Sequence, residues 1–119
     1  MVSADDEFPD AGDLYWLEFG QPSGHGQSGR RPAIVVSPRS YNASSSFVVV
    51  CPVTRQSKPW PYKVPLVASS EISGFVLVDQ VRCVDRRLRL RRFGGRASDE
   101  SLSEVRSVLA SILGIPVAT

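Results

Sequence analysis

Two polar side chains, Arg31 and Thr54, border two apolar stretches of the chain and could act together on a phosphate. Arg31 comes shortly before the stretch 33–37, and Thr54 ends the stretch 47–54. If these stretches are neighbouring antiparallel strands, the start of the first and the end of the second share one edge of a sheet. A guanidinium binds a phosphate through two parallel hydrogen bonds, and a hydroxyl can donate another. The same spacing also fits an exposed arginine paired with an N-terminal acid and a threonine that closes a turn.

Charge is distributed unevenly along the chain. Residues 1–29 hold six acids and no Lys or Arg, residues 30–69 hold six bases and no acid, and residues 70–97 add seven arginines. Twelve of the fourteen bases are arginine, whose planar fork suits phosphate, and flat faces for stacking a nucleobase come from Trp16, Trp60 and Tyr62. The pattern indicates either a surface that binds nucleic acid or a solvated basic face.

Common enzyme and metal motifs are missing from the sequence. It has no phosphate-binding loop, no Gly-x-Ser-x-Gly and one histidine, His25, in a glycine-rich stretch. Cys51 and Cys83 are too few for a zinc site, and their apolar neighbours predict buried reduced thiols or, alternatively, one disulfide. We therefore expect neither a metal nor a cofactor.

The elements that must position Arg31 and Thr54 are short strands. A glycine-rich loop is expected at 20–29 and a polar turn at 41–45, and strands are expected at 13–19, 33–37, 47–54, 62–67, 75–81 and 86–93. Pro52 should mark an edge or a bulge. Such closely spaced strands predict a small, strongly bent antiparallel barrel.

The last segment has a helical period, because apolar residues recur every three or four positions over 99–113. Ser98 is a suitable N-cap, Gly114 suits the position after the last turn, and Pro116 prevents continuation. The chain is thus predicted to be mainly β with a C-terminal helix.

Length and composition bound the domain organisation. The 119 residues are 42% hydrophobic and 22% charged, which is typical of one globular domain. Residues 1–11 are expected to be a flexible acidic N-terminus, 12–114 the barrel domain and 115–119 a tail. No apolar run reaches the roughly 18 residues of a membrane helix, and the acidic start is unlike a signal peptide, so we expect a cytoplasmic protein.

Four blocks of this sequence resemble the MazF/PemK family of bacterial toxins, in the same order and with matching separations. They are residues 12–16 (GDLYW), 29–38 (GRRPAIVVSP), 52–58 (PVTRQSK) and 79–82 (DQVR). The resemblance covers about residues 10–114. It implies a small SH3-like barrel of the CcdB/PemK type, a homodimer, and a metal-independent endoribonuclease that acts on single-stranded RNA. It also implies neutralisation by a MazE-like antitoxin whose acidic segment binds across the toxin.

The resemblance assigns roles to individual residues. The family's catalytic arginine falls on Arg31 and its catalytic threonine on Thr54. Substrate-groove positions fall on Gln56, Ser57, Lys58 and Gln80, and in the loop before the arginine only Gln27 matches, with Gly26 where the family often has glutamate. The basic composition adds four expected RNA contacts: Arg30, Arg55, Arg82 and Arg86.

The chemistry implied is cleavage by the 2′-hydroxyl of the RNA itself, which leaves a 2′,3′-cyclic phosphate and a 5′-hydroxyl. The protein then supplies positioning, proton transfer and charge stabilisation. Two other functions remain open at this point. A CcdB-like gyrase poison would share the fold, although such proteins rely on a C-terminal Trp-Gly-Ile that residues 113–119 lack. A non-catalytic RNA-binding barrel is the other.

Overall fold

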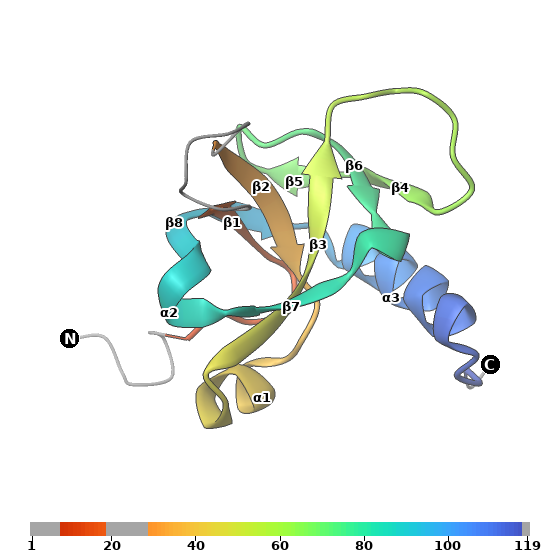
Figure 1. The fold of residues 1–119 in the computed structure, drawn as a ribbon. Helices are drawn as coiled ribbons and strands as arrows, with labels where there is room; N and C mark the ends of the chain where they lie inside the picture. The colour runs from red at the N-terminus through yellow and green to blue at the C-terminus, as the bar shows by residue number, and fades with distance from the viewer. Residues whose placement is uncertain (1–7, 19–28, 118–119) are drawn as a thin grey trace.

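The computed structural model describes residues 8–18 and 29–117, which form eight strands and four helical segments (Figure 1). In chain order these are β1 (Asp13–Glu18), β2 (Arg30–Val35), α1 (Arg39–Ser44), β3 (Phe47–Thr54), β4 (Lys63–Leu66), β5 (Ala68–Ser69), β6 (Gly74–Leu77), the 3₁₀ turn η2 (Val78–Gln80), β7 (Arg82–Asp85), α2 (Arg86–Arg89), β8 (Leu90–Ala97) and α3 (Asp99–Leu113). In these two ranges, no helix combines the length and apolar character needed to cross a membrane.

The strands form a strongly bent antiparallel sheet in the order β4-β6-β3-β2-β1-β8-β5, with β7 also paired to β3. Strand β3 changes partner along its length: Val50 pairs with Arg82 of β7, whereas Val53 pairs with Val76 of β6. Pro52 lies between these two regions, where a residue without an N–H interrupts no ladder on that side of β3. The sheet therefore closes into the nearly complete barrel that the strand pattern predicts.

Alternation along β3 divides the apolar core into two clusters. Cys51 and Val53 belong to the larger one, which lies between the barrel and α3, while Val48 and Val50 belong to a smaller one beneath β1, β2 and β7. Members of the smaller cluster also include Leu17, Ala33 and Val35, all fully buried. These residues make a rigid base for the polar side chains at the adjoining strand ends.

Helix α3 forms over the residues that the periodicity predicts. The Ser98 hydroxyl accepts from the Ser101 N–H, and Gly114 adopts a left-handed conformation (φ 69°) that ends the helix. Val105 is fully buried against the barrel. Both helix ends therefore agree with the sequence prediction.

Several secondary-structure predictions are wrong. The expected polar turn at 41–45 is helix α1, and the expected strand at 86–93 begins with helix α2 before β8. The cause of α2 is Asp85, whose carboxylate accepts from the N–H groups of Arg87 and Leu88 and so stabilises a helical turn. The expected strand at 75–81 is divided into β6 and η2, and β7 was not anticipated.

Residues 8–11, which we expected to lie in a flexible lead-in, instead pack against α1. The fully buried Asn42 side chain donates to the carbonyls of Pro9 and Ser37 (both 2.9 Å) and accepts from the Ser37 hydroxyl (2.5 Å). The Arg39 N–H donates to the Asp10 carboxylate (2.9 Å). Helix α1 thus attaches the start of the chain to the barrel.

Replacing Asn42 should destabilise the fold, because a buried polar group that loses its partner pays a desolvation cost. We expect Asn42→Ala to lower the free energy of unfolding by about 3 kcal/mol in urea denaturation. The control Ser40→Ala, at an exposed position of the same helix, should change it by less than about 0.5 kcal/mol. An unchanged urea midpoint for Asn42→Ala would contradict this role.

Candidate functional site

Strands β2 and β3 bring Arg31 and Thr54 to one edge of the barrel. Their ladder pairs Ala33 with Pro52, and Arg31 and Thr54 each lie two residues beyond this pair. Because side chains alternate along a strand, both lie on the face that carries Ala33 and Pro52. Figure 1 shows the start of β2 and the end of β3 at the same upper end of the molecule.

Two hollows lie at this edge and share one residue. The first, of about 100 Å³, is lined by Arg31, Pro52, Gln80 and Arg82, and we call it the arginine hollow. The second, of about 370 Å³, is the aromatic hollow, lined by Thr54, Gln56, Lys58, Pro59, Trp60, Lys63, Leu77, Asp79 and Gln80. Gln80, at the end of η2, lines both hollows and therefore lies between the Arg31 and Thr54 sites.

Thr54 is held by close backbone packing and a local turn. Gly74 (φ 127°) lies so near the Thr54 carbonyl that a Cβ on it would be 2.1 Å from that oxygen, so only glycine fits. The Thr54 hydroxyl oxygen accepts from the Gln56 N–H (3.2 Å). Its own proton is then available to donate to a ligand.

Lys63 fixes the loop that follows Thr54. Its ammonium donates to the carbonyls of Gln56 (2.6 Å) and Lys58 (2.5 Å) and lies 5.5 Å from the centre of the Phe75 ring. Because both carbonyls belong to the predicted groove segment, Lys63 sets the shape of the aromatic hollow. Its ammonium group acts here as a donor to the protein's own backbone.

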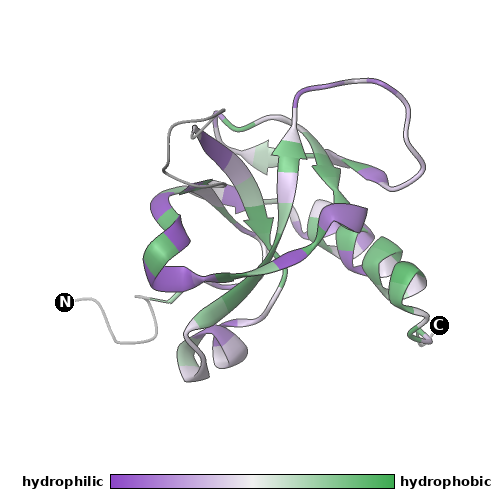
Figure 2. Cartoon of the chain, in the orientation of Figure 1, coloured by the Kyte–Doolittle hydropathy of each residue, from purple (hydrophilic) through white to green (hydrophobic). Residues whose placement is uncertain are grey.

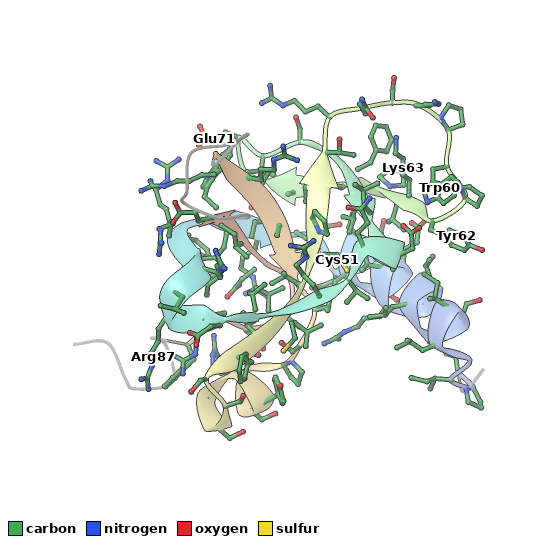
Figure 3. The ribbon with its side chains drawn as sticks, viewed as in Figure 1. Cys51, Trp60, Tyr62, Lys63, Glu71 and Arg87 are labelled. Carbon is green, nitrogen blue, oxygen red and sulfur yellow. The ribbon has the colours of Figure 1, made fainter. Side chains whose placement is uncertain are left out.

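Trp60 supplies a flat wall to the aromatic hollow. Its indole N–H donates to Asp79 (3.1 Å), its ring meets the edge of Tyr62 at 5.8 Å, and half of its surface remains exposed. Figure 3 shows Trp60, Tyr62 and Lys63 gathered on the same side of the molecule, beside β4. The indole is therefore fixed in orientation yet accessible.

The edge is strongly hydrophilic. Figure 2 shows hydrophilic residues at the start of β2 and around η2. All but one of the predicted site residues that the structure brings here are exposed, namely Arg30, Arg31, Arg55, Gln56, Ser57, Lys58, Gln80 and Arg82, whereas Thr54 is half-buried. Within residues 8–18 and 29–117, no ion pair involves Arg30, Arg31 or Arg55. Their positive charge therefore meets no carboxylate in this part of the chain.

Some sequence-predicted residues are not brought to this edge. Arg86 lies at the opposite end of β3, where it donates to the Ser45 carbonyl (3.0 Å) and its guanidinium lies 4.8 Å from the centre of the Phe8 ring. Trp16 lies on β1, and the guanidinium carbon of Arg92 is 5.8 Å from the centre of its ring. Gln27 and His25 lie outside the described residues.

Several lining residues had no role in the sequence prediction. Lys63 and Asp79 act by binding other groups of the hollow, namely two loop carbonyls and the Trp60 indole. Contacts of this kind cannot be recognised from the spacing or periodicity of residues in the sequence. The sequence predicts only that Pro52 marks an edge or a bulge, whereas the structure also places it in the lining of the arginine hollow. The sequence identifies Trp60 only as a flat aromatic face for stacking, because its position depends on the loop that Lys63 holds.

The two cysteines are both free but differ in environment, so the prediction of two buried thiols is correct only for Cys51. Burial raises the pKa of the Cys51 thiol to about 12, and the negative charge of Asp79 adds to the shift. Cys83 is exposed, with its sulfur 4.0 Å from the Tyr41 hydroxyl.

The geometry defines a class of protein: a small bent barrel with a basic, aromatic-lined groove at the meeting point of β2, β3 and η2. Residues 10–113 match the sequence model of the PemK-like, MazF-like toxin of type II toxin-antitoxin system. The chain therefore belongs to this toxin family.

Individual relatives agree with this assignment. The chain is 36% identical to the endoribonuclease toxin MazF of Escherichia coli K12, over 89% of this chain and 95% of that protein. A crystal structure of MazF from Deinococcus radiodurans is 44% identical, covers 91% of this chain and 98% of its own, and has a TM-score of 0.77. A MazE-MazF complex from the same organism is 40% identical, with 92% and 98% coverage and a TM-score of 0.75.

The different environments of the cysteines predict a simple thiol titration. At pH 8, a disulfide reagent should modify one thiol per folded chain, Cys83, because the buried Cys51 forms almost no thiolate when its pKa is about 12. After denaturation in guanidinium chloride, two thiols should react. Cys83→Ser should abolish the fast reaction, and two fast thiols in the folded protein would contradict the assignment.

Removing the Lys63 ammonium should loosen the groove loop without unfolding the barrel. For Lys63→Met we expect amide hydrogen exchange to rise over residues 55–60, because two carbonyls lose their donor. Exchange in α3 should stay at the wild-type rate. Lys58→Met is the matched control, since the exposed Lys58 side chain makes no comparable bridge in the described structure.

Proposed function

We propose that this chain is a toxin endoribonuclease that cleaves single-stranded mRNA at short sequence sites without a metal ion. The observation that carries the proposal is the placement of Arg31 and Thr54 on one face of the β2–β3 edge, in hollows joined by Gln80. The family membership and the endoribonuclease relatives support the same reaction class.

Arg31 stabilises the phosphate as it gains negative charge. Its exposed guanidinium belongs to a residue that lines a small hollow of about 100 Å³, which can take a phosphate oxygen. Two parallel N–H groups can bind two phosphate oxygens at once, and this contact strengthens as the attacking 2′-hydroxyl adds to phosphorus. A guanidinium is a poor general base because its pKa lies above about 12, so we assign charge stabilisation to it.

Thr54 donates a hydrogen bond to the same phosphate from the neighbouring hollow. Its hydroxyl oxygen is already held by the Gln56 N–H, which orients the O–H proton outward. Attack by the 2′-hydroxyl and departure of the 5′-oxygen then give a 2′,3′-cyclic phosphate and a 5′-hydroxyl. No nucleophile from the protein is required.

The RNA strand is bound through contacts on both sides of the scissile phosphate. Arg30, Arg55 and Lys58 contribute positive charge for backbone phosphates, and the polar groups that face bases or sugars come from Gln56, Ser57, Gln80 and Arg82. A base can stack on the exposed face of Trp60, a contact worth about 1–3 kcal/mol.

The proposed partners are a MazE-like antitoxin with an acidic segment and a second copy of the chain, and the proposed compartment is the cytoplasm. The MazE-MazF complexes of similar proteins support the antitoxin. An acidic segment suits the exposed arginines at the groove, where it would compete with RNA.

The test is cleavage of a long single-stranded RNA in excess EDTA. Wild-type protein should cut at a few short sites, and Arg31→Ala and Thr54→Val should each lose about 100- to 1000-fold in rate, the usual cost of one electrostatic donor. The control Arg106→Ala removes an exposed arginine on α3 that lines neither hollow, and should cut at the wild-type rate.

The same assay tests the chemistry. A substrate with a single 2′-deoxy sugar at the cut should resist, because the internal nucleophile is missing. Full activity of a folded Arg31→Ala variant, or cleavage that depends on added metal, would contradict the proposal. An inert wild type that still binds RNA would indicate a non-catalytic RNA-binding barrel.

A further inference from the structure

A third hollow continues the groove on the far side of Arg31. It has a volume of about 440 Å³ and is lined by Glu18, Arg82, Cys83, Val84, Asp85, Leu88 and Arg89; we call it the outer hollow. Arg82 lines both this hollow and the arginine hollow, as Gln80 lines both the arginine and the aromatic hollows. The three hollows therefore form one row, with Arg31 in the middle.

The sheet register explains this order. Glu18 at the end of β1 pairs with Arg30, and Leu17 pairs with Arg31, so β1 ends at the same edge as the start of β2. On the other side, β7 runs from Arg82, which pairs with Val50 in the middle of β3, to Asp85, which pairs with Phe47 at the start of β3. The outer hollow thus lies between β1, β7 and α2, beside the smaller core cluster.

The outer hollow differs chemically from the arginine hollow, because carboxylates line it together with arginines. One oxygen of each carboxylate is already used: Oε2 of Glu18 accepts from Arg91, and Oδ1 of Asp85 accepts from the N–H groups of Arg87 and Leu88 (2.9 and 3.2 Å). Among the described residues, Oε1 of Glu18 and Oδ2 of Asp85 accept no hydrogen bond. Within the part of the chain that the structure describes, these two oxygens are acceptors for a ligand.

Such a lining disfavours a phosphate and favours a nucleobase. The two carboxylates offset the charge of Arg82 and Arg89 and would repel a second phosphate, whereas an exocyclic amino group can donate to either carboxylate. The hollow is about four times the volume of the arginine hollow, and Leu88, which is 63% exposed, offers an apolar contact for a ring. In single-stranded RNA the base edges are accessible for such readout.

Resting on the proposed ribonuclease function, we infer that the outer hollow is a base-reading subsite that begins at Arg82, beside the Arg31 phosphate site, and extends toward the start of β3. It takes a base with an exocyclic amino group, that is guanine, cytosine or adenine, and discriminates against uracil, which has only carbonyl acceptors and one ring N–H. Glu18 and Asp85 are the residues that determine this specificity. Trp60 and the aromatic hollow hold the nucleotide on the opposite side of the cut.

Sequencing the ends left by cleavage of a long random RNA tests the inference. Wild-type protein should cut with uracil depleted about tenfold at one fixed position beside the cut, a discrimination typical of one good polar contact. Glu18→Gln and Asp85→Asn should each reduce this depletion to less than about threefold, while preferences on the other side of the cut stay unchanged. An unaltered uracil depletion in both variants, or no depletion in the wild type, would overturn the inference.

The chain offers a matched control for each variant. Glu71 pairs with Arg92 (3.3 Å) as Glu18 pairs with the adjacent Arg91, but Glu71 lines no part of the outer hollow. Glu71→Gln should therefore cut with wild-type base frequencies although it also breaks an ion pair on β8. Asp99→Asn serves in the same way for Asp85→Asn, since Asp99 is exposed in the first turn of α3.

A binding assay separates failure of this inference from failure of the proposed function. Fluorescent 2′-O-methyl hexamers cannot be cleaved, and cytosine and adenine hexamers should bind the wild type several-fold more tightly than the uracil hexamer. Glu18→Gln should bring the three affinities within about twofold, and Glu71→Gln should not. If wild-type protein cuts no RNA, this pattern still supports the subsite, and equal wild-type affinities for all three hexamers overturn it.

Discussion

The change of partner along β3 is the constraint on which the site depends. The first part of this strand pairs with β7 and the last part with β6, and the change falls at Pro52, which has no N–H to leave unpaired. At this point the sheet bends enough for η2 to reach the edge and for Gln80 to lie between the Arg31 and Thr54 sites. If β3 stayed with one partner, Thr54 would lie on a flat sheet and the row of hollows would not form.

The strand ends and the loop that together form the groove are held in place by different interactions. Ala33, Val35 and Val50 are fully buried beneath the edge, so the starts and ends of the strands are fixed by packing. The loop after Thr54 has little apolar surface, and its shape is fixed by the Lys63 ammonium and by Trp60 bound to Asp79. A phosphate site and a base site therefore differ in how they are held: the first by the core, the second by a few polar contacts.

Arginines in this protein serve two purposes that composition does not separate. Arg39, Arg91, Arg92 and Arg96 pair with carboxylates of the described chain and support its fold, and Arg86 packs on Phe8. Arg30, Arg31 and Arg55 make no ion pair within the described residues and lie at the groove. An arginine is thus available to bind a ligand only where the fold places no carboxylate beside it. The outer hollow is lined by both arginines and carboxylates.

The sequence alone determined the barrel, the C-terminal helix with both of its ends, and the meeting of Arg31 and Thr54, because alternation, capping residues and antiparallel pairing are local rules that act over short stretches. It did not predict α2, since one carboxylate at Asp85 outweighed the strand-like alternation that follows. The sequence also led us to expect Arg86 in the groove, because a run of arginines does not show toward which end of the sheet each one lies. In the structure, Arg86 follows β7 and lies at the start of β3, away from Thr54. The row of hollows was decided by tertiary structure alone, because Glu18 joins Arg82 and Asp85 in one hollow, and Arg31 joins Gln80 in the next, only when the sheet closes.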